Sequence, residues 1–175
     1  MKFSTCILLV AMIAIAPKTF AQKNSGEIKV GHLFYVSLPD FMERTVGLNS
    51  AASIQFISNE NDVAGFIIED SKAELKLAET NFATLKDFYQ FFEKDFLTGL
   101  DKRTISTPVE YQENGKNYIE FDASYLDKDM NTEINYYVCL IESRDYYYKV
   151  LCWSTADKKD KFRPGFKNIA LSIRD

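Results

Sequence analysis

The chain has 175 residues, of which 46% are hydrophobic and 26% charged, and its formal net charge is −4 at pH 7. This length suits one domain whose core is large enough to need no metal or disulfide cross-link. Because acidic residues outnumber basic ones and no basic run occurs, the composition argues against a nucleic acid or an anionic membrane as the partner.

The N-terminus has the pattern of a secretory signal peptide. Lys2 precedes an apolar run of ten residues, 7–16, and small residues follow at the positions that a signal peptidase inspects, ending at Ala21. The run is shorter than the roughly 20 residues needed to cross a bilayer. We therefore expect cleavage after Ala21 and a soluble protein that is exported to the periplasm or the extracellular space.

The predicted organisation is a signal peptide over residues 1–21, a flexible tail over 22–28 and a single domain over 29–175. No repeat, low-complexity tract or Pro/Ser-rich linker divides the chain after the signal. Without the two lysines of the signal, 19 basic residues face 25 acidic ones. The mature chain thus keeps an acidic surface, and no later segment is apolar enough to span a membrane.

The first half of the mature chain begins with β-rich segments. Residues 32–38 (HLFYVSL) end at a Pro-Asp turn signal. Residues 53–58 and 63–69 flank the polar sequence Asn-Glu-Asn-Asp, so they are predicted to form a hairpin.

A long amphipathic helix is predicted over residues 84–100. Its apolar positions recur at helical spacing, at Leu85, Phe88, Tyr89, Phe92, Phe96, Leu97 and Leu100. Thr84 and Asp87 form a capping-box pattern at its start, and Gly99 is a stop signal near its end. A stripe this broad must pack on a sheet.

The second half contains further strands and a final helix. Residues 103–112 predict a weak edge strand broken by Pro108. Residues 116–125, 134–141 and 146–153 predict strands, and the last two are apolar on both faces, which is typical of strands covered on both sides. Residues 160–173 have helical spacing and would cover the second face.

The predicted fold is therefore α+β. It consists of a mainly antiparallel β-sheet of six to seven strands, flanked by the long central helix and the C-terminal helix.

Several segments of this chain resemble the bacterial exported PsbP-related proteins, which share the Mog/PsbP-type α/β/α sandwich. The similarity lies in FYVSLPD (34–40), SIQF (53–56), FIIEDSKAEL (66–75), TLKDFYQFF (84–92) and the tail WSTADKKDKFRPGFKNIALSI (153–173). Members of this fold serve as photosystem accessory subunits, Ran-binding proteins, envelope proteins and secretion-effector chaperones. The resemblance thus implies non-catalytic binding, and it supplies no active site to carry over.

A concentration of tyrosines is the feature most suggestive of a partner surface. These residues surround one predicted hairpin, at Tyr136, Tyr137, Tyr146, Tyr147 and Tyr148. Aromatic side chains that project from a sheet are enriched at protein interfaces. Ordinary cross-strand packing is the alternative reading of the same residues.

Cys139 and Cys152 are the two cysteines left after the signal. A tight turn between their strands places them on one face but not directly opposite each other, whereas a disulfide needs Cβ atoms about 3.5–4.5 Å apart. Two buried free thiols are favoured, and a structural bridge is the alternative.

No pattern in the sequence predicts a catalytic, cofactor or metal site. His32 is the only histidine and has no nucleophile motif in its vicinity. Residues 127–133 (DKDMNTE) resemble the start of a calcium loop, but Thr132 and Val138 stand where that loop needs Gly and Glu, so a polar hairpin turn is the better reading.

The hypotheses that remain are three. The first is a binding module that engages a protein of the cell envelope through its sheet edge or its tyrosine-rich hairpin. The second is a carrier of a small apolar ligand lodged between the helical phenylalanines (Phe88, Phe92 and Phe96) and the sheet. The third and weakest is an acid/base hydrolase that uses Glu69 and Asp70.

Overall fold

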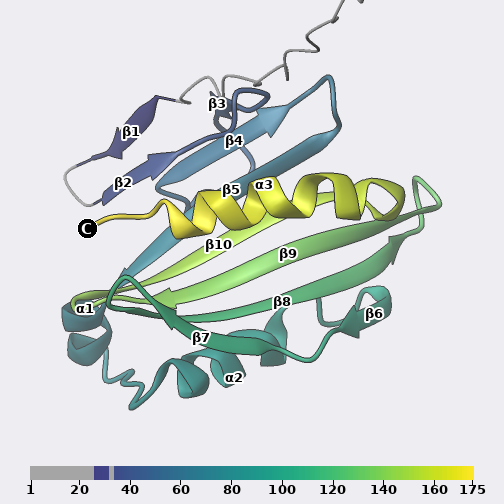
Figure 1. Ribbon diagram of the computed structural model, residues 1–175. Helices are drawn as coiled ribbons and strands as arrows, with labels where there is room; N and C mark the ends of the chain where they lie inside the picture. The colour runs from purple at the N-terminus through teal and green to yellow at the C-terminus, as the bar shows by residue number, and fades with distance from the viewer. Residues whose placement is uncertain (1–25, 32–33) are drawn as a thin grey trace, which may run out of the picture.

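An antiparallel sheet of eight strands forms the centre of the molecule (Figure 1). The computed structural model describes residues 26–31 and 34–175. In chain order the strands of this sheet are β3 (Glu43–Thr45), β4 (Ile54–Ser58), β5 (Val63–Ser71), β6 (Asp101–Ile105), β7 (Val109–Glu113), β8 (Lys116–Asp127), β9 (Thr132–Glu142) and β10 (Tyr146–Thr155). Their spatial order is β3-β4-β5-β10-β9-β8, with β6 and β7 both pairing with β8.

The predicted α+β class and antiparallel sheet are confirmed, although the sheet has eight strands rather than six to seven. The predicted edge strand over 103–112 forms two strands, β6 and β7, one on each side of Pro108. Proline supplies no N–H to a ladder, so strand pairing is interrupted around Pro108. Strand β3 has only three residues, which is too short to show an alternating pattern.

A separate two-stranded ribbon, β1 (Glu27–Val30) and β2 (Phe34–Ser37), lies beside the main sheet. Strand β1 begins inside the stretch that the sequence predicted as a flexible tail. Tyr35 of β2 exchanges two backbone hydrogen bonds with Arg174, of 2.7 and 3.0 Å, so the ribbon is joined to the C-terminal end of the chain. The predicted signal peptide lies outside the described residues.

Helix α2 (Leu85–Asp95) begins where the capping box predicted, since the Thr84 hydroxyl accepts from Asp87 N and the Asp87 carboxylate accepts from Thr84 N. It ends earlier than predicted, because Phe96 is extended and Leu97 has a left-handed φ of +58°. The predicted C-terminal helix is α3 (Lys159–Leu171), which follows the short 3-10 helix η1 (Ala156–Lys158). Helix α1 (Lys72–Leu77) was not predicted, because its six residues bury no side chain.

The two long helices lie on opposite faces of the sheet. Figure 1 shows α3 across β9 and β10 on one face, and α2 below β8 and β9 on the other. Buried residues accordingly form one core under α3 and a second core under α2. As predicted, β9 is buried on both faces: Tyr137 and Cys139 belong to the first core, and Val138 and Leu140 to the second.

No helix in the part of the chain that the structure describes is long and apolar enough to cross a membrane.

Candidate functional site

A cleft of about 570 Å³ opens between the start of α2 and the hairpin of β7 and β8. We call it the α2 cleft. Its lining residues are Ala83, Thr84, Leu85, Lys86, Glu110, Tyr111, Gln112, Asn117, Tyr118, Ile119 and Glu142. This volume lies within the range of pockets that bind small molecules or a few side chains.

The hairpin sets one wall of the α2 cleft. Asn114 and Gly115 both have positive φ, of +50° and +76°, which is the two-residue turn that matches the twist of the flanking strands. The resulting register pairs Glu110 with Ile119 and Gln112 with Asn117. Cross-strand partners share a face, so Glu110 and Gln112 stand on the α2 side of the sheet.

The start of α2 sets the opposite wall. The capping box fixes Thr84, and the next side chain, Leu85, is buried in the core under α2. Lys86 is on the exposed side of this first turn, with its ammonium 3.7 Å from the Glu110 carboxylate. Both side chains are more than half exposed, so this pair is weak and leaves the mouth of the cleft open.

Glu142 forms the polar end of the α2 cleft, and its carboxylate is well satisfied. It accepts hydrogen bonds from Lys72 Nζ at 2.8 Å, from Asn117 Nδ2 at 2.9 Å and from Tyr147 OH at 3.4 Å. Burial acts to raise the pKa of Glu142, but these bonds, with Lys72 first, hold the pKa below its usual range. Burial and the neighbouring Glu142 raise the pKa of Tyr147 to about 12. This group is therefore a fixed ion pair that ties α1 to β9, and it is not a proton donor near neutral pH.

A smaller cavity of about 210 Å³ adjoins the α2 cleft, with which it shares Ala83 and Glu142. Its other lining residues are Lys72, Leu75, Thr80, Asn81, Phe82 and Tyr147. The two spaces therefore lie side by side near the segment that connects α1 to α2.

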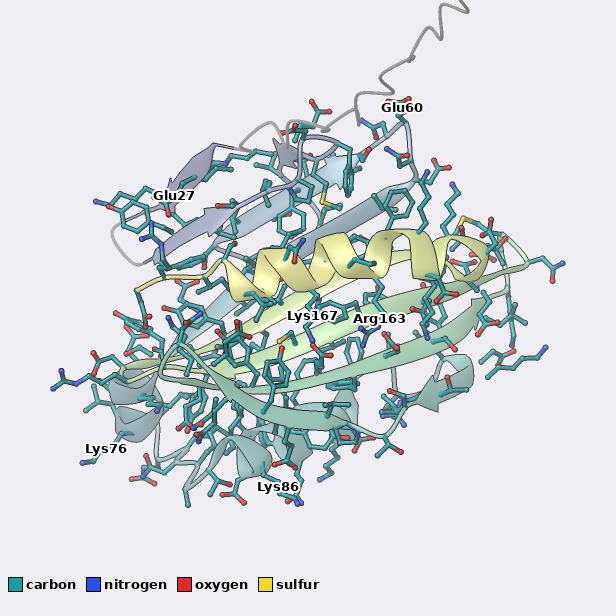
Figure 2. All side chains as sticks on the ribbon, viewed as in Figure 1. Glu27, Glu60, Lys76, Lys86, Arg163 and Lys167 are labelled. Carbon is teal, nitrogen blue, oxygen red and sulfur yellow. The ribbon has the colours of Figure 1, made fainter. Side chains whose placement is uncertain are left out.

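A second polar group lies on the opposite face of the sheet, under α3. We call it the α3 ion cluster: Tyr111, Glu120, Asp122, Tyr137, Lys159, Arg163 and Lys167. Figure 2 shows Arg163 and Lys167 extending from α3 toward β8.

Glu120 is at the centre of the α3 ion cluster and is only 5% exposed. Its carboxylate lies 3.0 Å from Lys167 Nζ and accepts hydrogen bonds of 3.1 Å from the hydroxyls of Tyr111 and Tyr137. Burial acts to raise the pKa of Glu120, but the bonds from Lys167 and Tyr111 outweigh it and lower the pKa. Arg163 Nε donates to Asp122 at 3.2 Å, so the second acid of the cluster is compensated as well.

The five tyrosines of the predicted partner surface differ in their exposure. Tyr137, Tyr147 and Tyr148 are at most 3% exposed, and only Tyr136 and Tyr146 are half-buried. The rings of the buried three pack against neighbours, for example Tyr147 stacked on Phe88 with ring centroids 4.5 Å apart. Packing in the two cores therefore accounts for most of this concentration, and of the five tyrosines only Tyr136 and Tyr146 keep substantial side-chain exposure.

Cys139 and Cys152 are both buried and both free thiols. Cys139 pairs with Val150 and Cys152 pairs with Tyr137, so the two cysteines are diagonal neighbours across β9 and β10, as the turn arithmetic predicted. Burial raises the pKa of the Cys139 thiol to about 12 and that of Cys152 well above its usual value. Such thiols are poor nucleophiles.

The acid pair of the hydrolase hypothesis does not converge. Glu69 and Asp70 are consecutive residues of β5, so their side chains point to opposite faces of the sheet. Asp70 pairs with Lys149 at 2.7 Å, whereas the pKa of Glu69 is raised, mainly by burial. Two carboxylates on opposite faces cannot act together on one substrate, so this arrangement does not support the hydrolase hypothesis.

The remaining two candidates from the sequence are residues 127–133 and His32. Residues 128–131 form the turn between β8 and β9, where Asp127 Oδ1 accepts a hydrogen bond from Met130 N, as the hairpin reading predicted. No group of three or more His, Cys, Asp or Glu side chains suited to a metal ion is found in the described ranges. His32 lies outside them.

Comparison of the fold with solved structures gives matches over most of the chain. The solution structure of cyanobacterial PsbP (CyanoP) from Synechocystis has a TM-score of 0.58 at 17% identity, over 81% of this chain and 85% of that one. The Ran-binding protein Mog1p of Saccharomyces cerevisiae also has a TM-score of 0.58, at 11% identity over 86% and 95%. LpqN of Mycobacterium tuberculosis, described as involved in cell envelope biogenesis, has a TM-score of 0.51 at 11% identity over 81% and 83%.

The chain therefore has the PsbP-like fold, and the resemblance drawn from its sequence is confirmed at that level. No protein-family model matches the sequence, and no curated protein matches it. At these identities the likeness defines the architecture and not the ligand.

Sequence reasoning did not identify Glu120 and Glu142. Glu120 could have been noticed as a carboxylate within the alternating strand 116–125, on the face opposite Ile119 and Phe121. The cations of the α3 ion cluster recur at i, i+4 and i+8 in the last helix, where Lys159 pairs with Asp122, and Arg163 and Lys167 contact Glu120. The α2 cleft left no comparable signal, because its walls come from segments distant in the chain.

Proposed function

We propose that this protein is an exported, non-catalytic binding module that holds a protein partner of the cell envelope at the α2 cleft and the adjoining edge of β7. The observation that carries the proposal is that an exposed sheet edge borders an open cleft with an apolar floor. Glu110 and Gln112 of β7 are exposed, and Leu85 and Ile119, both from the core under α2, line the floor of the cleft. A cleft with an apolar lining beside unpaired backbone is a common feature of peptide-binding sites.

The chemistry of the two polar groups supports binding rather than catalysis. The carboxylates of Glu120 and Glu142 have lowered pKa values and are each held by several donors. A general acid or base needs a pKa near the working pH. The fold of LpqN and Mog1p, whose descriptions name envelope biogenesis and Ran binding, is consistent with a role in binding.

Site-dependent capture from envelope extracts tests this proposal. Ala83 is exposed at the cleft wall, so Ala83→Trp would fill the α2 cleft without disturbing the core. Ala156→Trp, at an exposed position in η1, is the matched control. Cross-linking and mass spectrometry should recover the same partner with the wild-type protein and the control but not with Ala83→Trp. Equal recovery with all three proteins would exclude the α2 cleft as the site.

A small apolar ligand is the second candidate. The space between the helical phenylalanines and the sheet, where the sequence predicted this ligand, is filled by aromatic contacts. Phe88 stacks on Tyr147. Phe92 packs against Phe121, and Phe96 packs against Tyr136. The α2 cleft, with its apolar floor, is the better location. Native mass spectrometry of the purified protein should show added mass that Ala83→Trp removes, and an unmodified mass in repeated preparations would exclude a carrier.

A further inference from the structure

The outer edge of β7 has backbone groups available to an incoming strand. Among the strands that the structure describes, β7 pairs only with β8. The two-residue turn at Asn114 and Gly115 makes Glu113 and Lys116 the first hydrogen-bonded pair of the hairpin. Hydrogen-bonded and non-hydrogen-bonded pairs alternate along an antiparallel ladder.

This alternation identifies which residues of β7 face outward. Tyr111 and Val109 form the next hydrogen-bonded pairs with β8, at Tyr118 and Glu120. Glu110 and Gln112 occupy the non-hydrogen-bonded positions, so their N–H and C=O groups point away from β8. Two donors and two acceptors are thereby presented along one edge, at the spacing that a β-strand requires.

The same two residues border the α2 cleft. Glu110 and Gln112 share their face with Ile119 and Asn117, and all four line the cleft. Residues of a guest strand that pair with Glu110 and Gln112 would have their side chains on this face as well. Alternate guest side chains would therefore lie over the cleft, above Leu85 and Ile119.

The charges near this edge indicate which side chains a guest peptide strand should carry. Glu110 and Glu113 are both exposed, one on each face of β7. Lys86 is only weakly associated with Glu110, and Lys72 is fully engaged by Glu142 and by the Ser143 carbonyl. The edge thus retains acidic character and complements a guest that carries Lys or Arg.

We propose that the partner binds by strand addition. On this view, which rests on the proposed function, an extended peptide segment hydrogen-bonds to the backbone of Glu110 and Gln112. It inserts an apolar side chain into the α2 cleft and places a basic side chain beside Glu110 or Glu113. Backbone hydrogen bonds supply affinity, and the cleft supplies selection at every second residue.

Peptide selection with backbone-directed variants tests the inference. The probe is a phage-displayed library of random nonapeptides, followed by synthesis of the enriched sequences and measurement of Kd by fluorescence polarisation. Gln112→Pro removes one outward N–H at a position that does not bond to β8, and proline is tolerated at such edge positions. Gln112→Ala is the control, because it removes the side chain but keeps the N–H.

The expected result is a family of peptides with an apolar residue and a Lys or Arg. Loss of one outward hydrogen bond should weaken their binding about tenfold in Gln112→Pro, against less than about threefold in Gln112→Ala. Binding that is equal in both variants would overturn strand addition, as would a library that yields no enriched peptide.

Methylation of each peptide nitrogen in turn gives a test on the unaltered protein. Only the guest amides that face β7 should be sensitive, so affinity should fall at every second position. A loss without this period of two would contradict the proposal even if Gln112→Pro fails to fold. If Ala83→Trp abolishes partner capture while Gln112→Pro retains it, the proposed function stands and strand addition fails. If both variants retain capture, the proposed function fails at this site as well.

Discussion

The hairpin of β7 and β8 presents one face to α3 and the other to α2. The polar side chains on the two faces differ in their burial and in their hydrogen bonding. On the α3 side, the Glu120 carboxylate is buried and is bonded by Tyr111, Tyr137 and Lys167. On the α2 side, Glu110 and Gln112 are exposed beside an open cleft. The α3 ion cluster therefore has a structural role, although it holds most of the charges. The candidate site lies on the α2 face, where Glu110 and Gln112 remain exposed to solvent.

Removal of Glu120 should produce the largest effect on stability. Glu120→Ala leaves the hydroxyls of the buried Tyr137 and the half-buried Tyr111, and the Lys167 ammonium, without their shared acceptor, so we expect the free energy of unfolding to fall by about 2–4 kcal/mol. Urea denaturation measures the change. Gln112→Ala, on the opposite face of the same hairpin, is the control and should change stability by less than about 0.5 kcal/mol. Similar losses in the two variants would remove the contrast between the faces.

The acid dependence of stability should depend on Glu120. The pKa values of Glu120, Glu142 and Asp175 are lowered in the folded protein. An acid with a lowered pKa stabilises the fold above the pKa of the unfolded chain, about 4, and this stabilisation is lost as pH falls through the folded value. Unfolding titrations below pH 5 should show a steep loss that is shallower in Glu120→Gln. An unchanged slope would place the titrating groups elsewhere.

Disruption of the ion pair at the end of the α2 cleft should have a smaller effect. Lys72→Met leaves Glu142 with two of its three donors, and the pair is partly exposed, so we expect a loss of about 1–2 kcal/mol. Lys76→Met, on the exposed side of α1, is the matched control. Thermal or urea unfolding of both variants decides whether this pair is structural.

Glu69→Gln should act in the opposite direction and with the smallest effect. Burial raises the pKa of Glu69, and Oε2 of this residue is a buried atom with no hydrogen-bond partner in the described residues. A raised carboxyl pKa means that stability is lost as pH rises through the folded value. The variant should therefore be more stable than the wild type at pH 7, by about 0.5–1 kcal/mol, and this gain should vanish below pH 4. Glu60→Gln, in an exposed turn, should show no gain.

The regular elements were predictable because local patterns determine them. The capping box at Thr84, the hairpin partners β9 and β10, and the alternation of Ile119, Phe121 and Ala123 were all evident in the sequence and are present in the structure. The end of α2 was not, because Phe96 and Leu97 continue the apolar spacing after the helix has stopped. There Arg103 caps the terminus from a distance by donating to Phe96 O at 2.8 Å, and tertiary contacts of this kind leave no local pattern.

The candidate site was less predictable for the same reason. Its two walls, at Ala83–Lys86 and at Glu110–Gln112, are brought together by the packing of α2 on β8. The five tyrosines appeared to be a surface because composition alone does not show which alternate residues of β9 and β10 point into a covered face. The second covering layer, which buries Tyr137 and Tyr148, comes from α3 and the ribbon of β1 and β2.

The bonds between Tyr35 and Arg174 also constrain the order of assembly. Arg174, which follows α3, forms an isolated antiparallel bridge with Tyr35 of β2, a strand that precedes the whole main sheet in the chain. Strand β5 likewise pairs with β10, whose residues follow it by roughly eighty positions in the chain. The native topology therefore depends on pairings between segments that are far apart in the chain. Because the entropy of closing such long loops is lost before the contacts form, we expect the sheet to fold slowly.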